Sequence, residues 1–546
     1  MPRLSALPKS SIRIFILCVW LGQFLTLRDP LDADGIAYLD IARFCANGKW
    51  HALLNGYWSP GLPFLLSIPL RLLKPDRFRD PLLIHALAFL TLCAAMLALE
   101  YFLKKLADYR TTVLADSDVP THGVLPEGET WLLSYALFFW TTTFWVPPAL
   151  QQPDILVFVI YLLAAALCMQ LSHCTELWRY AVLGIVLALG YLIKVVMFPI
   201  GFVLLFALWL QRPRSFARVV LAAAVFAALS LPFCLALSSA KGRLTYGDAG
   251  IINYRQIMGM DTAPLPATAL PRPTAAPHIQ EYANKLHLGT YPPWADPSYD
   301  FKGWKFVLNV KKQLNRTHVV LREYFDDYVV LLGALTCGII VLFAMGDTRQ
   351  IAPRLLRCQI LWLPAIAGLL FYATMRVSGR FLAGYTIALA ASCFASIWFR
   401  DVDYRFRLTR VVAVTVSVLL ILPAIVEAGH EIVGALHNAQ PDFEVAKTLR
   451  TIGIHEDDRV SYMGDALTDS SWAHLTGAKI VAEIPTQDVA SFWAADRQQQ
   501  EEVLRWLAAT NAKVLVTRNV PQPAMSLGWH QVGDTSYYIL PLANTP

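Results

Sequence analysis

The feature that most constrains this chain is a series of long apolar runs that extends from residue 14 to residue 426. Most of the runs approach the roughly 20 residues that an α-helix needs to cross a bilayer. Hydrophobic residues make up 56% of the 546-residue sequence and charged residues only 16%, which is outside the range of soluble domains. We predict a mainly α-helical, polytopic membrane protein with about eleven transmembrane helices. The predicted spans are Ile14–Leu27, Pro81–Leu106, Trp131–Val146, Ile155–Leu171, Tyr180–Ile193, Val195–Leu210, Phe216–Leu237, Tyr328–Met345, Gln359–Thr374, Phe381–Trp398 and Val411–Val426.

The basic residues between the runs predict the orientation. The first run follows a basic segment and ends in Arg-Asp-Pro rather than in a cleavage site, so we expect a retained helix and not a signal peptide. With an odd number of spans, the Arg-rich loops Gln211–Arg218, Gly346–Arg357 and Arg400–Arg410 fall on the same side as the N-terminus. Short cytoplasmic loops carry excess Lys and Arg. The N-terminus is therefore predicted inside, and residues 28–80, residues 238–326 and the C-terminal segment outside.

The first outer loop is rich in carboxylates. Asp29, Asp32 and Asp34 fall within six positions, and they would lie at the outer membrane surface. The apolar spacing over residues 34–46 predicts an interfacial helix. Residues 57–63 then open a second apolar run, which is too short to cross a bilayer.

The chain changes character near Gln440, where the apolar runs shorten and turns separate them. Strands are predicted at Arg459–Gly464, Lys479–Ile484, Lys513–Thr517 and Tyr537–Leu540, and a helix at Gln498–Ala509. We predict two domains, a transmembrane domain over residues 1–435 and a soluble α/β domain over residues 440–546. The sequence has neither GxGxxG nor a P-loop, so a nucleotide role is unsupported and no nucleic-acid partner is expected. The nine cysteines lack metal-type spacing, so neither disulfides nor a cysteine metal site is expected.

The charged residues near the spans lie at the predicted outer ends. Asp154 lies at the start of the fourth span, and Lys194 separates the fifth from the sixth. Arg376 and Arg380 lie just before the tenth. A transporter is expected to carry charges within its spans, together with repeats and broken helices. Acids and bases that converge on one membrane surface instead suggest a site for a phosphate and a proton transfer.

Several short motifs resemble a known family. They are Asp32-Ala-Asp34-Gly35 followed by Tyr38, Gly56-Tyr-Trp-Ser-Pro60, Gly190-Tyr-Leu-Ile-Lys194 and Arg376-Val-Ser-Gly-Arg380-Phe. In their order and sidedness, the chain resembles the GT-C superfamily of membrane glycosyltransferases. It is most similar to the bacterial branch that contains the aminoarabinose transferases and the protein O-mannosyltransferase-like enzymes. The resemblance covers about residues 10–430.

The resemblance implies a GT-C fold and the transfer of a sugar, usually with inversion, from a polyprenyl-phosphate donor to an acceptor hydroxyl. The reaction would take place on the periplasmic face of a bacterial inner membrane. The acceptor would be a lipid, a glycan or a protein, and membrane lipids would surround the enzyme. Some members of the superfamily use Asp-x-Asp with a divalent ion, whereas this branch generally does not require one. No metal ligand is therefore assigned.

The acids have competing interpretations. Asp34 is our candidate general base, and its alternative role is to cap the following helix. Asp32 is the competing base or a metal ligand. Asp154 would assist at the site or act as an N-cap. We expect Asp29 to be a turn residue and Asp40 to lie on an exposed helix face.

The bases and aromatic residues also have two interpretations each. Lys194, Arg376 and Arg380 are candidates for binding the lipid phosphate, because fixed cations stabilise a departing phosphate. The alternative for Lys194 is snorkelling to the membrane surface. Aromatic side chains of the outer loops would line the sugar or acceptor entrance or anchor the loops among lipid headgroups. These residues are Tyr57, Trp58, Tyr291, Trp294 and Tyr299.

Two other functions remain open at this stage. One is a transporter or flippase of a lipid-linked sugar, for which mutation of the outer carboxylates would change transport without changing a covalent product. The other is a polysaccharide ligase or polymerase, which would consume a diphosphate-linked oligosaccharide.

Overall fold

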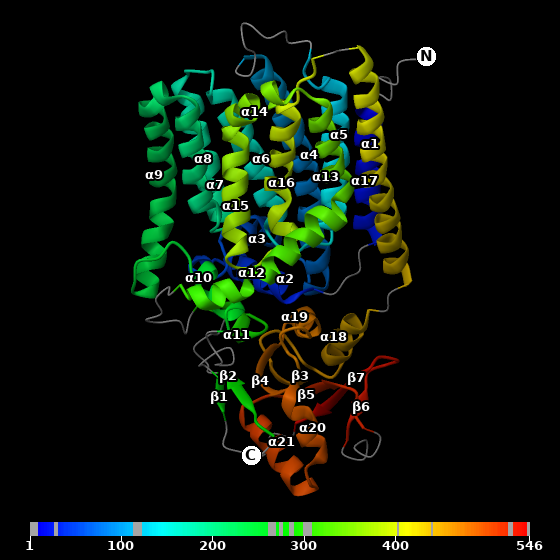
Figure 1. The fold of residues 1–546 in the computed structure, drawn as a ribbon. Helices are drawn as coiled ribbons and strands as arrows, with labels where there is room; N and C mark the ends of the chain where they lie inside the picture. The colour runs from blue at the N-terminus through cyan, green and yellow to red at the C-terminus, as the bar shows by residue number, and fades with distance from the viewer. Residues whose placement is uncertain are drawn as a thin grey trace.

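The computed structural model has two parts, a helical bundle and a smaller sheet domain at one end of it (Figure 1). The N-terminal helix begins at the opposite end of the bundle. The structure describes residues 9–26, 31–112, 123–259, 269–271, 277–282, 289–298, 308–400, 403–437, 440–521 and 528–542.

The bundle is built from the apolar runs of the sequence. In the described residues, α4 packs against α6, α7 against α9, and α17 against α5. The helices are α1 (Lys9–Thr26), α4 (Asp80–Thr112), α5 (Glu127–Phe144), α6 (Asp154–Leu171), α7 (Leu177–Ile193), α8 (Met197–Gln211), α9 (Phe216–Lys241), α13 (Gly333–Met345), α14 (Thr348–Arg357), α15 (Gln359–Ala373), α16 (Gly379–Ser396) and α17 (Asp403–His437).

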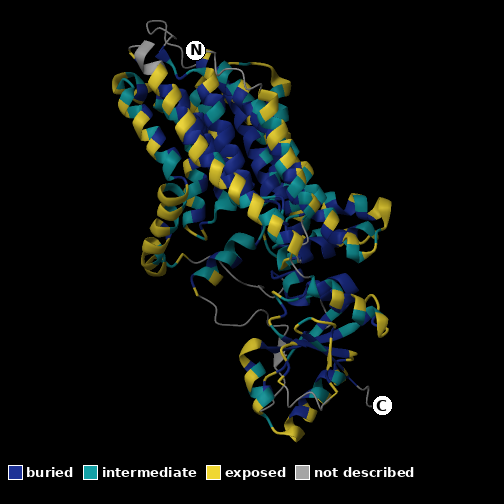
Figure 2. Cartoon of the chain, turned by 90° about the vertical axis from the view of Figure 1, so that its right-hand side faces the viewer, coloured by how far each residue is buried: buried dark blue, intermediate teal, exposed yellow. Residues whose placement is uncertain are grey.

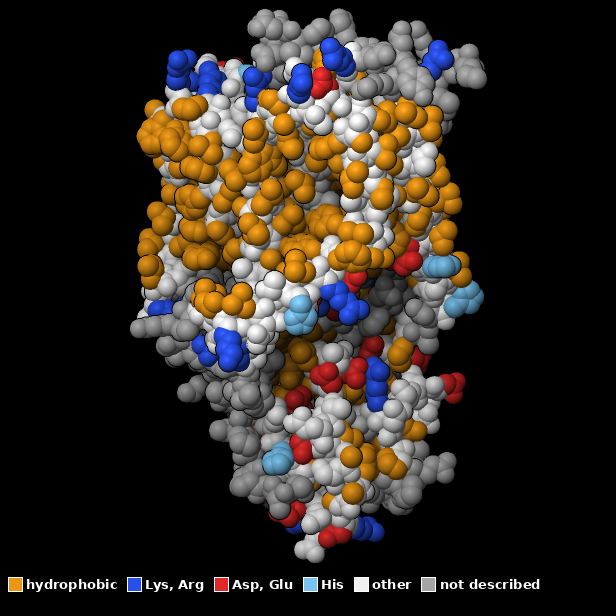
Figure 3. Space-filling model, viewed as in Figure 1, with side chains coloured by type: hydrophobic (Ala, Val, Ile, Leu, Met, Phe, Trp, Pro, Cys, Tyr) orange, Lys and Arg blue, Asp and Glu red, His pale blue; other side chains and the backbone are white. Residues whose placement is uncertain are grey.

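The bundle is apolar on its outside as well as in its core. Buried residues fill its interior (Figure 2), while leucines such as Leu97 and Leu235 are more than half exposed on its surface. Figure 3 shows the resulting apolar band, with Lys and Arg side chains along the end that carries the N-terminus. A surface of this kind is stable when hydrocarbon rather than water surrounds it.

The number of spans depends on how short and bent helices are counted. Among the described residues, five helices are long and apolar enough to cross a membrane, and the number rises to seven if each of two bent pairs is one span. One pair is α12 with its π-helical extension (Val310–Leu331) followed by α13, bent by 77°. Helices α7 and α8 are shorter apolar helices. The figure of about eleven spans therefore stays a prediction.

Short helices cover the end of the bundle next to the sheet domain. They are α2 (Ala33–Ala46), α3 (Gly61–Leu73), α10 (Ala249–Ile257), α11 (Pro292–Ala295) and α12 (Val310–Phe325). On α3 the exposed residues Phe64, Ile68 and Leu72 recur every four positions, which is the spacing of one helix face. This face is suited to the membrane interface, and the 13-residue helix is too short to cross a bilayer, as the sequence predicted for this run.

Helix α2 is the predicted helix over residues 34–46, but most of it is buried. It begins at Asp32, whose carboxylate accepts the Gly35 N–H at 2.6 Å. The expectation that Asp40 lies on an exposed face is wrong, because Asp40 is only 5% exposed. Its carboxylate is covered by Thr290 and by His474 of the sheet domain, so tertiary packing buries a side chain that the sequence alone placed in water.

In the described residues, the sheet domain has seven strands and four helices. The strand order is β1-β2-β4-β3-β5-β7-β6, with β3 parallel to β4 and β5. The strands are β1 (Ala269–Pro271), β2 (Gln280–Tyr282), β3 (Arg459–Gly464), β4 (Lys479–Pro485), β5 (Val514–Arg518), β6 (His530–Gln531) and β7 (Tyr537–Pro541). The helices are α18 (Pro441–Thr451), α19 (Ser471–Thr476), α20 (Thr486–Ala494) and α21 (Arg497–Ala509).

The alternation of apolar residues explains the layers of this domain. On β3, Val460 and Tyr462 pack with residues of α18 and α19, whereas Met463 packs with residues of α20 and α21. Successive side chains of a strand point to opposite faces, so a strand with apolar residues in sequence is covered on both sides. The strands β1 and β2 come from the segment 238–326, and β2 pairs with β4. The sheet therefore extends beyond the predicted segment 440–546.

Candidate functional site

A cavity of about 290 Å³ lies at the end of the bundle next to the sheet domain. It is lined by residues of α2, α6, α10, α11, α15 and α16 and of the breaks before α3 and α8. Two carboxylates and three cationic side chains meet in this one cavity: Asp34, Asp154, Lys194, Arg376 and Arg380.

Helix starts position three of these side chains. Asp34, Asp154 and Arg380 each lie in the first turn of their helix, α2, α6 and α16. The N–H groups of a first turn favour negative charge nearby. The start of α16 also needs glycine at residue 379, because a Cβ there would lie 2.0 Å from the Trp145 ring. These local requirements bring charged groups from distant parts of the chain to the same place.

The charged groups form two pairs, and one cation has no partner among the residues that the structure describes. Lys194 forms an ion pair with Asp154, and the Arg380 guanidinium lies 3.9 Å from the Asp34 carboxylate. The Phe381 ring lies beneath both cations, 4.2 Å from Lys194 Nζ and 4.9 Å from the Arg380 guanidinium carbon, which fixes their positions. Arg376 lines the cavity and makes no hydrogen bond or ion pair with the described residues.

Asp34 has the environment of a proton acceptor. Its Oδ1 accepts a hydrogen bond from Trp294 Nε1 at 3.3 Å. Burial, together with the charge of Asp32, raises the pKa of Asp34 above its ordinary value of 3.8, although Arg380 and Trp294 oppose the shift. A carboxylate with a raised pKa holds an abstracted proton more readily near neutral pH.

Asp32 serves α2 rather than the cavity. One of its oxygens caps the helix, and the other accepts a hydrogen bond from the Gln152 side chain. The Asp32 backbone N–H donates to Gln151 Oε1 at 3.0 Å. The cap that the sequence offered as the alternative role of Asp34 is therefore made by Asp32.

Aromatic rings form part of the cavity wall. Trp58 Nε1 donates to the backbone carbonyl of Trp294 at 2.8 Å, and the rings of Tyr57 and Trp58 lie 5.5 and 5.6 Å from that of Trp294. The Tyr57 hydroxyl donates to Asn253 Oδ1 at 2.8 Å. Residues 57–58, residue 253 and residue 294 are thus joined at the cavity.

Solved structures share this architecture at low sequence identity. ArnT from Cupriavidus metallidurans bound to undecaprenyl phosphate matches with a TM-score of 0.58 and 11% identity, covering 98% of this chain and 98% of that chain. The oligosaccharyltransferase of Archaeoglobus fulgidus in complex with Zn and sulfate matches with a TM-score of 0.53 and 12% identity, covering 93% of this chain and 68% of that chain. The chain has the GT-C fold. No protein-family model and no curated protein matches the sequence.

The predicted fold class is therefore confirmed, and the cavity lies where the GT-C fold joins its sheet domain. Most of the residues singled out in the sequence lie together there. Beyond the charged groups, these are Tyr57, Trp58 and Trp294. Tyr291 instead packs on the sheet domain, where its hydroxyl donates to Glu483 at 3.3 Å. Tyr299 lies outside the described residues.

Sequence reasoning assigned no role to several cavity residues of this GT-C fold. Tyr38 and Phe381 belong to the sequence motifs given above, so their positions in those motifs could have indicated a place at the site. Asn253 and Gln256 of α10 also line the cavity, but the polar loop that contains them has no pattern that predicts it. Only the fold brings this helix over the carboxylate.

The site does not offer a metal-ligand set. Among the described residues, no group of three or more His, Cys, Asp or Glu side chains could hold a metal ion. Both oxygens of Asp32 are engaged by protein donors, and Asp34 faces Trp294 and Arg380. The residues of the Asp-x-Asp motif therefore do not converge as ligands in this GT-C fold.

Proposed function

We propose that this protein is a membrane glycosyltransferase that transfers a sugar from a polyprenyl-phosphate donor to an acceptor hydroxyl. The observation that carries the proposal is one cavity in which the half-buried carboxylate of Asp34, with its raised pKa, meets three cationic side chains. The GT-C fold supports it, since ArnT with the same fold is bound to undecaprenyl phosphate.

In the proposed reaction, Asp34 takes the proton of the acceptor hydroxyl. The acceptor oxygen then forms its bond to the anomeric carbon while the bond from that carbon to the phosphate oxygen breaks. The phosphate leaves with the electron pair, and attack opposite the leaving group inverts the anomeric carbon. General base catalysis of this kind contributes about 10² to 10⁴ in rate.

The leaving phosphate needs positive charge rather than a proton. Lys194, Arg376 and Arg380 line the cavity, and Arg side chains suit phosphate because they donate two parallel hydrogen bonds. Arg376 has no ion-pair partner among the described residues, so it is free to bind an anion. Asp154 would hold Lys194 in place through their ion pair.

The neutral part of the cavity suits a sugar. Asn253 and Gln256 offer amide groups for sugar hydroxyls, and Tyr57, Trp58 and Trp294 offer rings for the faces of a pyranose. Ligand pockets commonly measure about 300 to 1,000 Å³, so a cavity of about 290 Å³ favours a monosaccharide over an oligosaccharide. The proposed acceptor is a hydroxyl of a lipid, a glycan or a protein, and the transfer assay with a membrane extract identifies which.

The test is a transfer assay with purified protein in lipid vesicles, polyprenyl-phosphate sugars as donors and a membrane extract as acceptor. The wild type is expected to release polyprenyl phosphate and form a glycosylated product, and Asp34→Asn to be folded and inactive. Asp534→Asn, at an exposed turn of the sheet domain, is the matched control and is expected to remain active.

Other outcomes identify the alternatives. Full activity of Asp34→Asn with loss of activity in Asp32→Asn would assign the base to Asp32. Consumption of a diphosphate-linked oligosaccharide alone would indicate a ligase or polymerase. No product from any carrier, together with movement of a lipid-linked sugar across the vesicle membrane, would indicate a flippase.

A further inference from the structure

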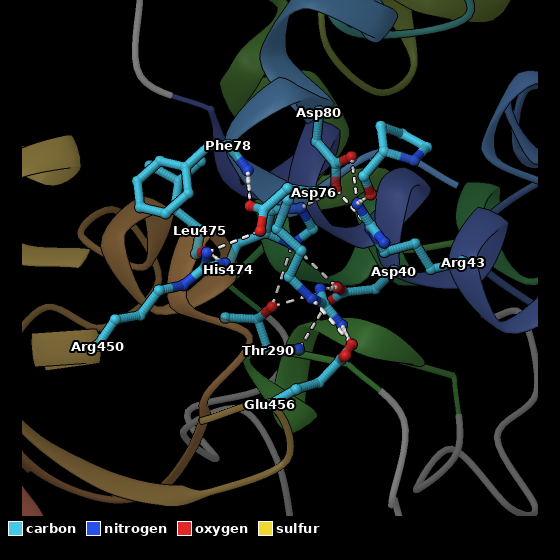
Figure 4. A network of polar contacts seen from close by, with 12 residues as sticks. Asp40, Arg43, Asp76, Phe78, Asp80, Thr290, Arg450, Glu456, His474 and Leu475 are labelled. Carbon is cyan, nitrogen blue, oxygen red and sulfur yellow. Dashed lines mark hydrogen bonds and ion pairs between the residues drawn. The ribbon is translucent and has the colours of Figure 1, made fainter. Parts of the chain in front are cut away.

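A buried histidine of the sheet domain lies between two carboxylates of the bundle (Figure 4). His474 of α19 is fully buried. Its Nδ1 lies 3.0 Å from Asp40 Oδ1 on α2, and its Nε2 lies 2.9 Å from Asp80 Oδ2 at the start of α4. Both ring nitrogens can donate at once only in the charged imidazolium. The contact is therefore a charged bridge between the two parts of the molecule.

Arginines complete the charge balance of this bridge. Arg43 of α2 donates to both oxygens of Asp80, at 2.7 and 2.6 Å. Arg77 lies 3.6 Å from Asp40 and pairs with Glu456 of the sheet domain at 2.7 Å. Removing one member of a buried charge network leaves its partners uncompensated, which is costly.

A further ion pair between the sheet domain and the bundle, which we call the rim contact, lies beside the bridge. Arg450 of α18 pairs with Asp76 at 2.8 Å and also donates to the Leu475 carbonyl at 2.8 Å. Because Leu475 follows His474 in the chain, the rim contact holds the same short helix, α19. Figure 4 shows both contacts in one cluster.

The same network fixes the long outer loop. The Thr290 backbone N–H donates to Asp40 Oδ2 at 2.5 Å, and the Thr290 hydroxyl lies 3.2 Å from Asp40 Oδ1. Gly289 has φ +87°, and a Cβ there would lie 2.9 Å from Asp40 Oδ2, so the close approach needs glycine. The Thr290 carbonyl in turn accepts the Ile480 N–H of β4 at 2.9 Å.

Two routes lead from this network to the cavity. Asp40 lies on the same helix as Asp34. Thr290 precedes α11, which carries the Trp294 indole that donates to Asp34. The bridge at His474 thus holds both partners of the hydrogen bond from Trp294 to Asp34. It holds Asp34 through α2 and Trp294 through residues 289–295.

We propose that His474 is a positioning residue, through which the sheet domain holds α2 and residues 289–295 in register so that Trp294 meets Asp34. This role would explain why a transferase keeps a domain that contributes no described residue of the segment 441–542 to the cavity lining. The part of the inference that concerns activity depends on the proposed function. The structural part does not.

The bridge depends on pH. Burial alone would lower the pKa of His474, but the charges and hydrogen bonds of Asp40 and Asp80 raise it above its ordinary value of 6.5. A raised histidine pKa gives stability that is fully present below 6.5 and is lost as the pH rises through the folded-state pKa. The groups that face the imidazolium are Asp40 and Arg43 of α2, Asp80 of α4, Arg77 beside α4, and the Thr290 hydroxyl.

Hydrogen exchange measured by mass spectrometry on the full-length protein in lipid vesicles tests the structural part. In His474→Gln, the peptide that covers residues 289–298 is expected to exchange about tenfold faster or more, because Thr290 loses its fixed acceptor. Peptides of β3 and β5 should stay protected as in the wild type. His530→Gln, the same change at an exposed position of the domain, should leave both regions unchanged.

The pH dependence gives a second readout, which a role of His474 in packing alone, without its charge, would not produce. Protection of residues 289–298 in the wild type, corrected for intrinsic exchange, is expected to fall as the pH rises above 6.5. In His474→Gln this pH dependence should disappear. Unchanged protection in His474→Gln, or the same pH dependence in both proteins, would overturn the proposal.

If His474→Gln also loses protection in β3 and β5, the sheet domain itself is destabilised, and the same exchange measurement on Asp40→Asn tests the proposal instead. This variant removes the charge that anchors Thr290 without altering the sheet domain. Faster exchange of residues 289–298 with an intact sheet would support the proposal, and unchanged exchange would overturn it.

In the transfer assay, His474→Gln is expected to lower kcat about tenfold with little change in the donor KM. Faster exchange without any activity in the wild type would indicate that the proposed function, and not the bridge, is wrong.

Discussion

Two aspartates only two positions apart have different environments in this fold. Asp32 caps α2 and accepts a hydrogen bond from Gln152, whereas Asp34 points into the cavity and accepts a hydrogen bond from Trp294. Each carboxylate therefore has a separate task, and the charge of Asp32 still reaches Asp34 and raises its pKa.

This charge effect predicts the result of Asp32→Asn. Transfer activity should rise with pH as Asp34 loses its proton, with a midpoint above 3.8 because its pKa is raised. Asparagine still caps a helix, but it removes the charge that helps to raise the pKa of Asp34. The acidic limb of the kcat/KM profile should therefore move to lower pH, while the activity on the plateau is largely kept.

The profile is measured from pH 4 to pH 9 for wild type, Asp32→Asn and the control Asp534→Asn. The control should keep the acidic limb of the wild type. A limb that stays in place in Asp32→Asn would show that Asp34 is not the titrating group. Complete loss of activity across the range would favour Asp32 as the base.

Glu483 is a second buried acid, in strand β4 of the sheet domain. Burial is the main cause that raises its pKa from 4.5 to about 7, although hydrogen bonds from Tyr282 and Tyr291 oppose the shift. Below 4.5 the carboxyl is neutral in the folded and unfolded states. Above about 7 the folded state must hold it ionised, which costs about 3.5 kcal/mol at 1.4 kcal/mol for each pKa unit.

We therefore expect Glu483→Gln to stabilise the sheet domain at pH 8 and to have little effect at pH 4.5. Thermal unfolding followed by circular dichroism at both pH values measures the difference. Glu502→Gln, at an exposed position of α21, is the control and should change neither midpoint. Equal stability of Glu483→Gln and wild type at pH 8 would contradict the prediction.

Among the elements, the start of α2 packs closely against its surroundings. A Cβ at Gly35 would lie 2.1 Å from Gln151 Oε1, the same oxygen that accepts the Asp32 N–H. The helix start and the loop before α6 are therefore in direct contact, and a Cβ at residue 35 would displace the Gln151 amide from the Asp32 N–H. Asp34 and Asp154 come from these two elements.

Gly35→Ala is expected to lower kcat/KM by about 10²-fold, because a displacement of about 1 Å at reacting groups costs that much. The protein should remain folded. Gly429→Ala in α17, where a Cβ meets nothing within 4 Å, is the matched control and should keep full activity with equal or higher stability. Wild-type kcat/KM in Gly35→Ala would show that the start of α2 tolerates movement.

For the whole molecule, the distribution of charge predicts how the bundle sits in a membrane. Basic side chains line the end that carries the N-terminus, and the sheet domain lies at the other end (Figures 1 and 3). Since short basic loops stay in the cytoplasm, we propose that the cavity and the sheet domain face the periplasm of a bacterial inner membrane.

A reporter fused after residue 546 tests this orientation. Alkaline phosphatase needs disulfides and is active only outside the cytoplasm, so the fusion should be active. The same reporter fused within the Arg-rich loop Gly346–Arg357 should be inactive. The reverse pattern would place the cavity in the cytoplasm and would contradict a periplasmic reaction.

The sequence alone determined the elements, because their signals are local. Bilayer-length apolar runs predicted the bundle helices, and alternation placed β3 at Arg459–Gly464, where the structure has it. Charges at the outer ends of spans predicted five groups that do line one cavity. Local patterns also marked Asp32 and Asp34 as important, since a helix cap and a carboxylate cluster are both visible in the order of residues.

Tertiary structure decided what those residues contact. Only packing buries Asp40 and places the Tyr291 hydroxyl against Glu483 of the sheet domain. Packing also brings Asn253 and Gln256 to the cavity. Only packing joins β1 and β2 of the outer loop to the sheet and closes His474 between two aspartates. These contacts join residues that are far apart in the sequence, and no periodicity records them, because a long-range contact depends on the shape of both partners rather than on the neighbours of either.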